Sequence, residues 1–193
     1  MAKIDFKPGN MLYPLPVVMV TCEGSDGKPN IITIGWTGTI NSDPAMVSIS
    51  VRKARHSYNL IKESGEFCIN LTTRDLAFAT DLCGVKSGRD VDKWKEAHLT
   101  PFPSTVIKAP GIAESPVNIE CKVTYSEDLG THTVFFGKVV AVHADDKYMD
   151  EKGTFHFEDT DPITYSHGKY YTLREQVGKF GYSVKKNKSK KAK

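Results

Sequence analysis

Short stretches in which apolar and polar residues alternate set the pattern of most of this chain. In the stretch 47–52, valine or isoleucine occupies every odd position and serine or arginine every even position. That period of two is typical of a half-buried strand, and it predicts that Ser50 and Arg52 leave the strand on its polar face while Val51 faces inward. Alternation or short apolar runs predict further strands at residues 17–22, 29–36, 67–71, 119–125, 134–142, 155–157, 163–165 and 170–173.

Helical spacing of apolar residues interrupts these strands. One helix is predicted to start with Ser57 as its N-cap and to end at Gly65, and a second to start with Thr72 as its cap and to stop at Gly84. A short helix is also expected within residues 92–97. Many short strands with two interspersed helices favour a mainly β fold, an antiparallel β-barrel with helical excursions, over a parallel α/β sheet.

Turn-forming residues indicate how the strands connect. Residues 23–28 are rich in Gly, Ser and Asp, so the strands on either side of them are predicted to form a hairpin. The stretch 36–39 (Trp-Thr-Gly-Thr) is expected to end the second strand of that hairpin, and the stretch 42–44 (Ser-Asp-Pro) to break the chain before the next strand. Gly137 lies inside a long apolar run, as at a bend or bulge of a barrel strand.

The charge of the chain is concentrated at its end. The formal net charge is +3, but residues 185–193 contain six lysines and no acid, which leaves 20 basic and 23 acidic side chains in the rest. A body with a charge near −3 is a poor partner for nucleic acid. The expected organisation is therefore one domain over residues 1–182, followed by a disordered, solubilising, lysine-rich tail over residues 183–193.

The four cysteines, Cys22, Cys68, Cys83 and Cys121, are widely separated and form no Cys-x-x-Cys pair and no Cys/His cluster with zinc spacing. No bound metal is therefore expected. Residues 1–10 lack the apolar core of a signal peptide, and no run is long enough to span a membrane. The expectation is a cytoplasmic protein with reduced thiols and no membrane partner.

Several common catalytic motifs are missing from the sequence. No Gly-x-Gly-x-x-Gly follows a predicted strand, and the stretch 84–88 lacks the spacing of a P-loop. There is no Gly-x-Ser-x-Gly elbow and no His-x-x-x-His pair. These absences disfavour a Rossmann nucleotide enzyme, an NTPase and a metal hydrolase.

The junction after the strand at 47–52 has the chemistry of a phosphate site. Arg52 ends the strand, and Arg55, His56 and Ser57 lead into the predicted helix. The free N–H groups and dipole at a helix N-terminus, together with guanidinium groups, suit a phosphate monoester. A strand–helix turn with solvated arginines is the alternative that this stretch leaves open.

Small and hydrogen-bonding residues surround this candidate in the sequence. Trp36, Thr37, Gly38 and Thr39 provide an aromatic ring, two hydroxyls and a flexible backbone, while Lys93 adds a charge. Further small residues with exposed N–H groups are Cys83, Gly84, Ser87 and Gly88. A planar, phosphorylated heterocycle would use all of these groups, although each residue singly also fits a role in the core or in a turn.

These pieces occur in an order and spacing that resemble the flavin reductase-like, FMN-binding split-barrel family, and within it the flavoredoxin-like group. The resemblance covers about residues 12–182. The matching pieces are residues 14–21, 29–36, 42–44, 52–58, 65–71, 83–93, 120–121, 130–132 and 136–139.

The resemblance implies a Greek-key antiparallel split barrel that forms a homodimer and binds FMN in a groove near the subunit interface. By position, the FMN phosphate and ribityl end would meet Arg52, Arg55, His56 and Ser57. The isoalloxazine would be lined by Trp36, Thr37, Gly38, Thr39, Ser50, Cys83, Gly84 and Lys93, and Val51 and Ser87 are further candidates for binding the cofactor. His132 matches a histidine on the nicotinamide side of the flavin and is the catalytic candidate; the acid that usually precedes it is Thr131 here.

Two main functions follow from this resemblance. One is an enzyme, an oxidoreductase that uses NADH or NADPH as co-substrate and transfers hydride to FMN. The other is a flavoredoxin-like electron-transfer protein with tightly bound FMN and a protein redox partner. A flavin-binding protein without a redox partner is a third possible function.

Independently of the resemblance, the sequence favours a homodimer. The aromatic-rich strands at 134–142 and 170–173 provide more apolar surface than one small core readily uses.

Overall fold

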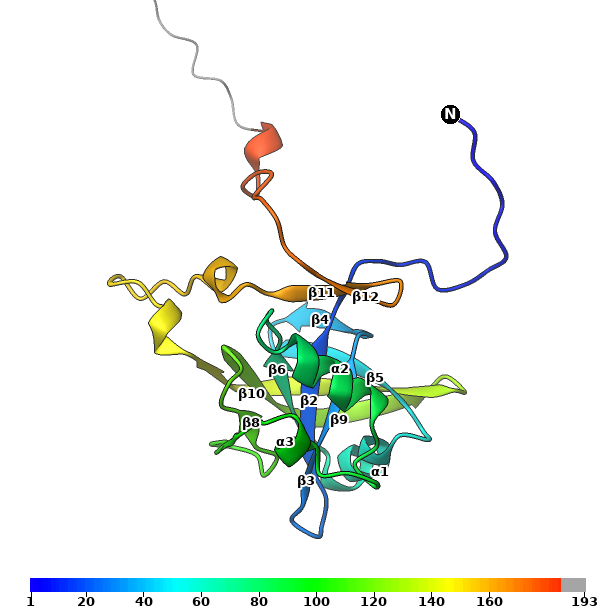
Figure 1. The fold of residues 1–193 in the computed structure, drawn as a ribbon, viewed down its shortest axis with the longest axis vertical. Coiled ribbons are helices and arrows are strands. Elements are labelled where there is room, and N and C mark those ends of the chain that lie inside the picture. Colours follow the sequence, from blue (N-terminus) through cyan, green and yellow to red (C-terminus); the bar gives the residue numbers. More distant parts are fainter. Residues whose placement is uncertain (185–193) are drawn as a thin grey trace, which may run out of the picture.

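The computed structural model describes residues 1–184, and its main element is one antiparallel sheet of seven strands (Figure 1). The strands lie in the spatial order β3-β2-β6-β9-β10-β5-β4, so that β3 and β4 are the two edges. Their bounds are β2 Val18–Glu23, β3 Pro29–Ile34, β4 Thr37–Ser42, β5 Ala45–Arg52, β6 Glu66–Leu71, β9 Val117–Asp128 and β10 His132–Ala144.

The sheet coils on itself but does not close. Apolar side chains from opposite ends of the strand order, such as Ile32 of β3 and Ile49 of β5, belong to one buried core. The N–H of Ser50 donates to the carbonyl of Trp36 at 2.9 Å, which ties β5 to the chain just after β3. Because β3 and β5 are near each other without forming a ladder, the barrel is split along this line. The fold class predicted from the sequence, an antiparallel split barrel, is confirmed.

The predicted alternation of β5 is also confirmed. Val47, Ile49 and Val51 are buried, whereas Ser48 and Ser50 are partly exposed and Arg52 is exposed. Gly137 lies at a register shift between β9 and β10, where a Cβ would approach the Phe67 ring to 2.6 Å. The strand therefore bends at the residue that leaves room for a buried aromatic ring.

Within the described residues, three α-helices accompany the sheet: α1 His56–Ser64, α2 Ala77–Val85 and α3 Lys93–Glu96. The second helix and the segments beside it cover the outer face of β2 and β3, where Met19, Ile31, Ala79 and Cys83 form a second buried cluster. Gly65 ends α1 in the left-handed conformation (φ 66°), as predicted, and Asp92 caps α3 by accepting from the N–H of Lys95.

Three predicted helix boundaries are wrong. Ser57 is the second residue of α1, and Arg55 occupies the N-cap position without a side-chain cap. The Ser57 hydroxyl is buried and accepts from Asn30 instead, so tertiary packing has replaced the local cap. Thr72 donates to the carbonyl of Val17, and α2 begins only at Ala77. Gly84 lies inside α2, which ends at Val85.

Two predictions for strands are also wrong. The stretch 36–39 does not end β3, because β3 stops at Ile34 and Thr37 opens the separate edge strand β4. The stretch 42–44 is consequently the turn of the β4–β5 hairpin. Residues 155–157 do not form a strand: Phe155 makes only an isolated bridge with Met149, and a 3-10 helix begins at Phe157.

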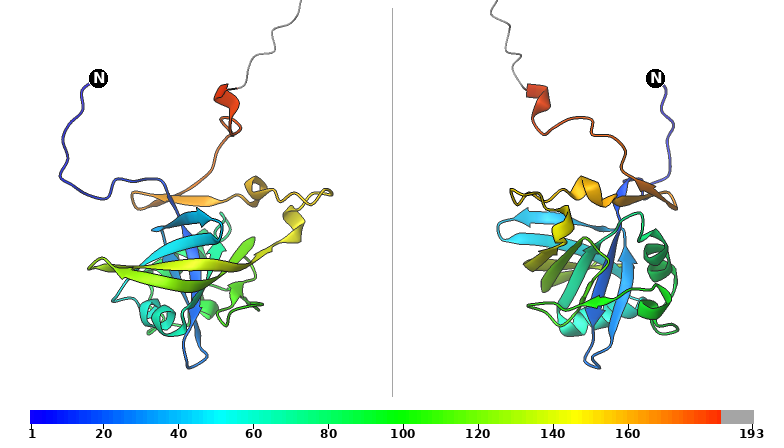
Figure 2. Two further views of the ribbon diagram at one scale, coloured as in Figure 1. Left: turned by 180° about the vertical axis from the view of Figure 1, so that it is seen from behind. Right: turned by 60° about the vertical axis from the view of Figure 1, so that its left-hand side comes forward.

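A small second sheet lies across one end of the barrel (Figures 1 and 2). It joins β1 to the hairpin of β11 and β12, whereas β7 and β8 pair separately. The remaining elements are β1 Leu15–Pro16, β7 Pro101–Phe102, β8 Gly111–Ile112, β11 Ile163–Ser166 and β12 Lys169–Thr172, with the 3-10 helices η1 Asp146–Tyr148, η2 Phe157–Thr160 and η3 Tyr182–Val184.

The first two residues of the tail expected at 183–193 lie in η3, and the rest of that tail lies outside the described residues. Within residues 1–184, no helix is long and apolar enough to cross a membrane. All four cysteines are buried and unpaired.

Candidate functional site

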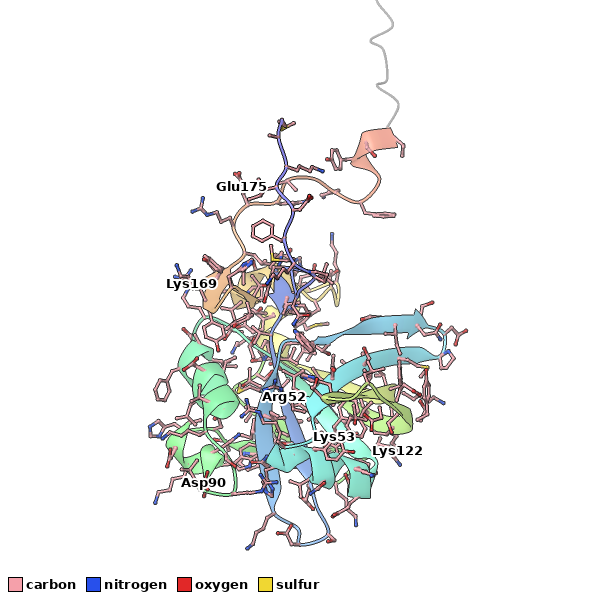
Figure 3. The ribbon with its side chains drawn as sticks, turned by 90° about the vertical axis from the view of Figure 1, so that its right-hand side faces the viewer. Arg52, Lys53, Asp90, Lys122, Lys169 and Glu175 are labelled. Atoms are coloured by element: carbon pink, nitrogen blue, oxygen red, sulfur yellow. The ribbon has the colours of Figure 1, made fainter. Side chains whose placement is uncertain are left out.

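A groove follows the open edge of the barrel along β3. It consists of two cavities of about 400 and about 340 Å³, which share Ile32 and Arg55 in their walls. In Figure 3, three labelled residues mark the course of this groove: Lys169 of the β11–β12 hairpin lies at its upper end, Arg52 in the middle, and Asp90 on the loop after α2 at its lower end. The strand β3 runs from Asn30 in the smaller cavity to Ile34 in the larger one.

The smaller cavity, here named the basic basin, gathers positive charge at the start of α1. Its walls contain one acidic side chain, Asp90. The basic and hydroxyl-bearing side chains that line it are Arg55, His56, Ser57, Lys86, Ser87, Arg89 and Lys93. Because the first N–H groups of α1 have no partners within the helix, they add to this set of anion-binding donors.

Gly88 allows the loop after α2 to close over the basin. A Cβ on Gly88 would lie 2.0 Å from Oδ1 of Asn30 and 3.2 Å from Cδ2 of His56. Any larger residue would therefore displace either the loop or the buried Asn30 side chain. Arg89, the next residue, donates from its guanidinium to the carbonyl of Ala54 at 3.2 Å, which connects the loop to the strand–helix junction.

Lys93 is buried and holds several elements together. Its Nζ donates to the carbonyls of Ile31 at 2.7 Å and Cys83 at 2.8 Å, which leaves one of its three N–H donors for the basin. Burial lowers the pKa of Lys93, although the neighbouring Cys83 opposes this effect. Burial also raises the pKa of the Cys83 thiol to about 11, so Cys83 is a small neutral wall residue.

His56 is the first residue of α1 and faces the same basin. Burial lowers the pKa of its imidazole, and the nearby charges of Arg89 and Lys93 lower it further. Ser57, beside it, accepts from Nδ2 of Asn30 at 2.7 Å. Both residues line the basic basin, but the Ser57 oxygen already has a protein partner.

The larger cavity, here named the ring groove, contains many of the other predicted residues. Trp36, Ser50, Val51, Arg52, Gly84 and His132 all line it, together with Arg55. The N–H of Arg55 donates to the carbonyl of Arg52 at 3.0 Å, so a tight turn keeps both arginines at the groove. Lys53, between them, points elsewhere and pairs with Asp128.

His132 stands beside Trp36 in the ring groove. Their ring centroids are 4.6 Å apart with an interplanar angle of 34°. The Nδ1 atom of His132 lies 2.9 Å from the hydroxyl of Thr131, and burial, with the charge of Arg52, lowers the pKa of His132. The side chain is thus a neutral imidazole near pH 7.

A third cavity of about 720 Å³ adjoins the ring groove and shares Leu15, Gly35, Trp36 and Ser50 with it. Thr37 and Gly38 line this cavity, as do Met11, Leu12 and Val134. The Thr37 hydroxyl is engaged, since it donates to the carbonyl of Ser48 at 2.7 Å. Thr39 is exposed, pairs with Val47, and lines none of these three cavities.

Sequence reasoning missed several residues of the groove. Asp81, Tyr165 and Tyr170 line the ring groove, and Asn30, Lys86 and Arg89 line the basin. Asn30 could have been predicted as a site residue, because it is a polar residue in an otherwise apolar strand. Tyr165 and Tyr170 could not have been predicted, because only the tertiary structure brings the C-terminal hairpin to α2.

The residues present fit a ligand with one phosphate and a flat ring. The basin supplies cationic and N–H donors at one end, and the ring groove has aromatic and aliphatic walls at the other. Among residues 1–184, no group of three or more His, Cys, Asp or Glu side chains could hold a metal ion.

Comparison with known proteins identifies the family and similar folds. Residues 10–174 match the model of the family described as flavin reductase like domain. The structure resembles a flavoredoxin of Desulfovibrio vulgaris (Miyazaki F), with 30% identity, a TM-score of 0.88, and coverage of 95% of this chain and 100% of that one. A flavoredoxin from Methanosarcina acetivorans gives 27% identity, a TM-score of 0.83 and the same coverage.

A relative with a named activity is an NADH-dependent FMN reductase of Streptomyces nodosus subsp. asukaensis. It is 24% identical over 178 residues, which are 90% of this chain and 86% of that protein. Since the family model matches residues 10–174, most of the chain, and the structure superposes on two flavoredoxins over 95% of its length, this protein belongs to the flavin reductase-like domain family.

Proposed function

We propose that this protein binds FMN and acts as an NAD(P)H-dependent flavin reductase. The observation that carries the proposal is the connected groove, which joins a basic basin at the start of α1 to a ring groove bordered by Trp36 and His132. The name of the Streptomyces relative, an NADH-dependent FMN reductase, supports the same activity.

The chain's residues would have distinct tasks in this function. Arg55, Lys86 and Arg89 would bind the phosphate, since each faces the basin with a cationic donor. Trp36 would limit access of water to one side of the ring groove. The flavin, when bound, supplies the chemistry of accepting and passing on two electrons.

His132 would position the co-substrate or exchange a proton beside the ring. Its pKa is lowered by burial and by Arg52, so the imidazole is neutral at the pH of the cell. When the Thr131 hydroxyl donates to Nδ1, the ring proton is on Nε2 and is available as a donor.

A specific observation favours a second function, that of a flavoredoxin-like electron carrier. The two flavoredoxin structures cover 95% of this chain at TM-scores of 0.88 and 0.83. A carrier would retain FMN tightly and receive electrons from a redox partner protein, without a site for nicotinamide.

Anaerobic mixing of the FMN-loaded protein with NADH, and separately with NADPH, tests the proposal. Bleaching of the flavin absorbance at a rate well above that of free FMN supports a reductase. Tight FMN binding without bleaching by either nucleotide favours the carrier. Failure to bind FMN after reconstitution overturns both.

The proposal also includes a homodimer in the cytoplasm. Trp36, Ile40 and Tyr125 are large apolar side chains that the single chain leaves exposed, as are Leu12 and Leu173 in the terminal segments. Four buried, unpaired cysteines are compatible with a reducing compartment. Light scattering at micromolar concentration should give twice the chain mass; a monomer mass contradicts the dimer.

A further inference from the structure

Asp81 of α2 is the one acidic side chain in the described lining of the ring groove. One of its oxygens, Oδ1, accepts from the Tyr170 hydroxyl at 3.1 Å, which attaches the β11–β12 hairpin to α2. The chain then continues along α2 and its following loop toward Lys86 and Ser87 in the basic basin. Asp81 therefore lies at the end of the groove away from the basin.

The carboxylate of Asp81 has capacity for another hydrogen bond. Two carboxylate oxygens offer about four acceptor sites, and the Tyr170 hydroxyl fills one of them. Burial and then the hydrogen bond to Asp81 raise the pKa of Tyr170 to about 12, so the tyrosine remains a donor to Asp81. The groove thus presents one carboxylate acceptor, one oxygen of which is already bound by the Tyr170 hydroxyl.

The edge strand β3 provides a donor next to this acceptor. On an antiparallel edge, alternate residues direct both backbone groups away from the neighbouring strand. The carbonyls of Pro29 and Ile31 do so, because they accept from the Trp94 indole and from Lys93. Thr33, two residues farther along, must therefore direct its N–H and C=O the same way, into the ring groove that it lines.

Thr33 and Asp81 are held close together. The Thr33 hydroxyl donates to the carbonyl of Thr80 at 2.5 Å, and Thr80 directly precedes Asp81. The half-buried Thr33 and the exposed Asp81 therefore both line the wall of the ring groove formed by β3 and α2, one with a backbone N–H donor and one with a carboxylate acceptor. This pattern is complementary to an imide, in which an N–H lies between two carbonyls.

We propose that Asp81 accepts a hydrogen bond from the imide N–H (N3) of the flavin ring, while the N–H of Thr33 donates to the neighbouring ring carbonyl. This inference rests on the proposed binding of FMN. The oxidised ring system has a single N–H, so one well-placed carboxylate acceptor is enough to recognise it, and a hydrogen bond to a charged group is among the stronger ones.

The adjoining cavity meets the ring groove at Leu15 and Trp36, and it contains Met11, Leu12 and Val134 beside polar residues such as Asn10 and Ser48. Its apolar residues suit the dimethylbenzene edge of the flavin, and its described lining contains no carboxylate that could accept from an imide N–H. Asp81 thereby determines specificity for flavins that are unsubstituted at N3.

Titration of FMN and of N3-methylated FMN into the full-length protein and into Asp81→Ala tests this assignment by fluorescence quenching. Wild type should bind FMN about ten- to a hundredfold more tightly than the methylated analogue, the range of one charge-assisted hydrogen bond. Asp81→Ala should lose that discrimination. The midpoint potential of bound FMN should rise in Asp81→Ala, because a negative charge no longer opposes the charge gained on reduction.

Two controls separate the acceptor from the hairpin attachment. Tyr170→Phe breaks the Asp81–Tyr170 hydrogen bond but keeps the carboxylate, so it should retain the discrimination. Asp75→Asn removes an exposed acidic charge just before α2 and should behave as wild type.

Three results overturn the inference. If Asp81→Ala discriminates between FMN and N3-methylated FMN as well as wild type does, another group of the protein recognises N3. Equal binding of the two flavins by wild type would show that it is not read at all. Unchanged FMN affinity with a raised KM for NADH would assign Asp81 to the nicotinamide carboxamide. In each of these, FMN still binds, whereas absence of FMN binding by wild type contradicts the proposed function itself.

Discussion

Arg52 and His132 are direct partners across β5 and β10, and both side chains line the ring groove. The arginine closes a strand whose polar face was evident from alternation, whereas the histidine opens a strand 80 positions later. Their pairing brings a permanent positive charge beside an imidazole, which helps to keep His132 neutral. The same ladder places Trp36, through the Ser50–Trp36 hydrogen bond, within reach of both.

His132→Asn should slow flavin reduction by NADH or NADPH by about ten- to a hundredfold, which is the lower end of what general acid–base or positioning groups contribute. The same change should alter FMN affinity by less than about threefold. The reason is that the imidazole borders the ring groove but not the basin. Stopped-flow absorbance under anaerobic conditions measures the rate, and His98→Asn, a change at an exposed histidine, is the matched control.

The pH dependence of flavin reduction follows from the direction in which the pKa of His132 is shifted. The pKa of His132 lies below its ordinary value of 6.5, so the imidazole stays neutral above that pH and gains a proton only in more acidic solution. The wild-type rate should be flat between about pH 7 and 8 and change below 6.5. A profile that His132→Asn shares with wild type would assign the titration to another group.

Arg55→Ala should weaken FMN about ten- to a hundredfold and leave riboflavin unaffected, because the arginine borders the basic basin and riboflavin lacks the phosphate. Titration with both flavins measures this difference. Lys62→Ala removes a positive charge at the other end of α1, where it lies over the Tyr58 ring, and should behave as wild type. If the two variants bind FMN alike, the phosphate lies elsewhere.

Ser57→Ala should destabilise the FMN-free protein by about 1–3 kcal/mol. Its hydroxyl is the acceptor for Nδ2 of Asn30, and both side chains are buried, so the amide would lose its hydrogen-bond partner in the protein. Urea unfolding of the FMN-free protein measures the change. Ser64→Ala, at the half-buried end of the same helix, should lower the free energy of unfolding by less. Equal losses in the two variants would show that the Asn30–Ser57 hydrogen bond does not account for the effect.

Glu120→Gln should destabilise the protein by about 2–3 kcal/mol at pH 7, because one carboxylate oxygen becomes an amide that faces N–H donors. The fully buried Glu120 accepts from the backbone of Thr105, Val106 and Ile107, and lies 2.6 Å from Nε2 of His143. Burial opposes its charge, yet these hydrogen bonds lower the pKa of Glu120 to about 2.

The contribution of Glu120 to the stability of the fold depends on pH in a way that the direction of its pKa shift determines. Its folded pKa lies below the ordinary value of 4.5, so its stabilisation is complete above 4.5 and is lost as the pH falls toward about 2. Urea unfolding of wild type and Glu120→Gln should therefore differ at pH 7 and converge near pH 2. Glu127→Gln, an exposed change on the same strand, should show no difference at either pH.

Several parts of this protein followed from local sequence alone. The period of two in β5 determined which side chains are buried, because a strand must alternate its faces. Gly65 marked the end of α1, since glycine adopts the left-handed conformation at low cost. The two arginines at the strand–helix junction were visible because the groove residues there are adjacent in the chain.

The tertiary structure decided what local signals could not. Ser57 has the chemistry of an N-cap, but Asn30 of β3 offers its hydroxyl a buried partner, and packing outweighed the local preference. Thr37–Ser42 became an edge strand because β5 supplied the ladder for it. Asp81 and Tyr170, 89 positions apart, meet only because the C-terminal hairpin crosses the end of the barrel. Contacts of this kind depend on how whole elements pack, and neither segment carries a pattern that specifies the other.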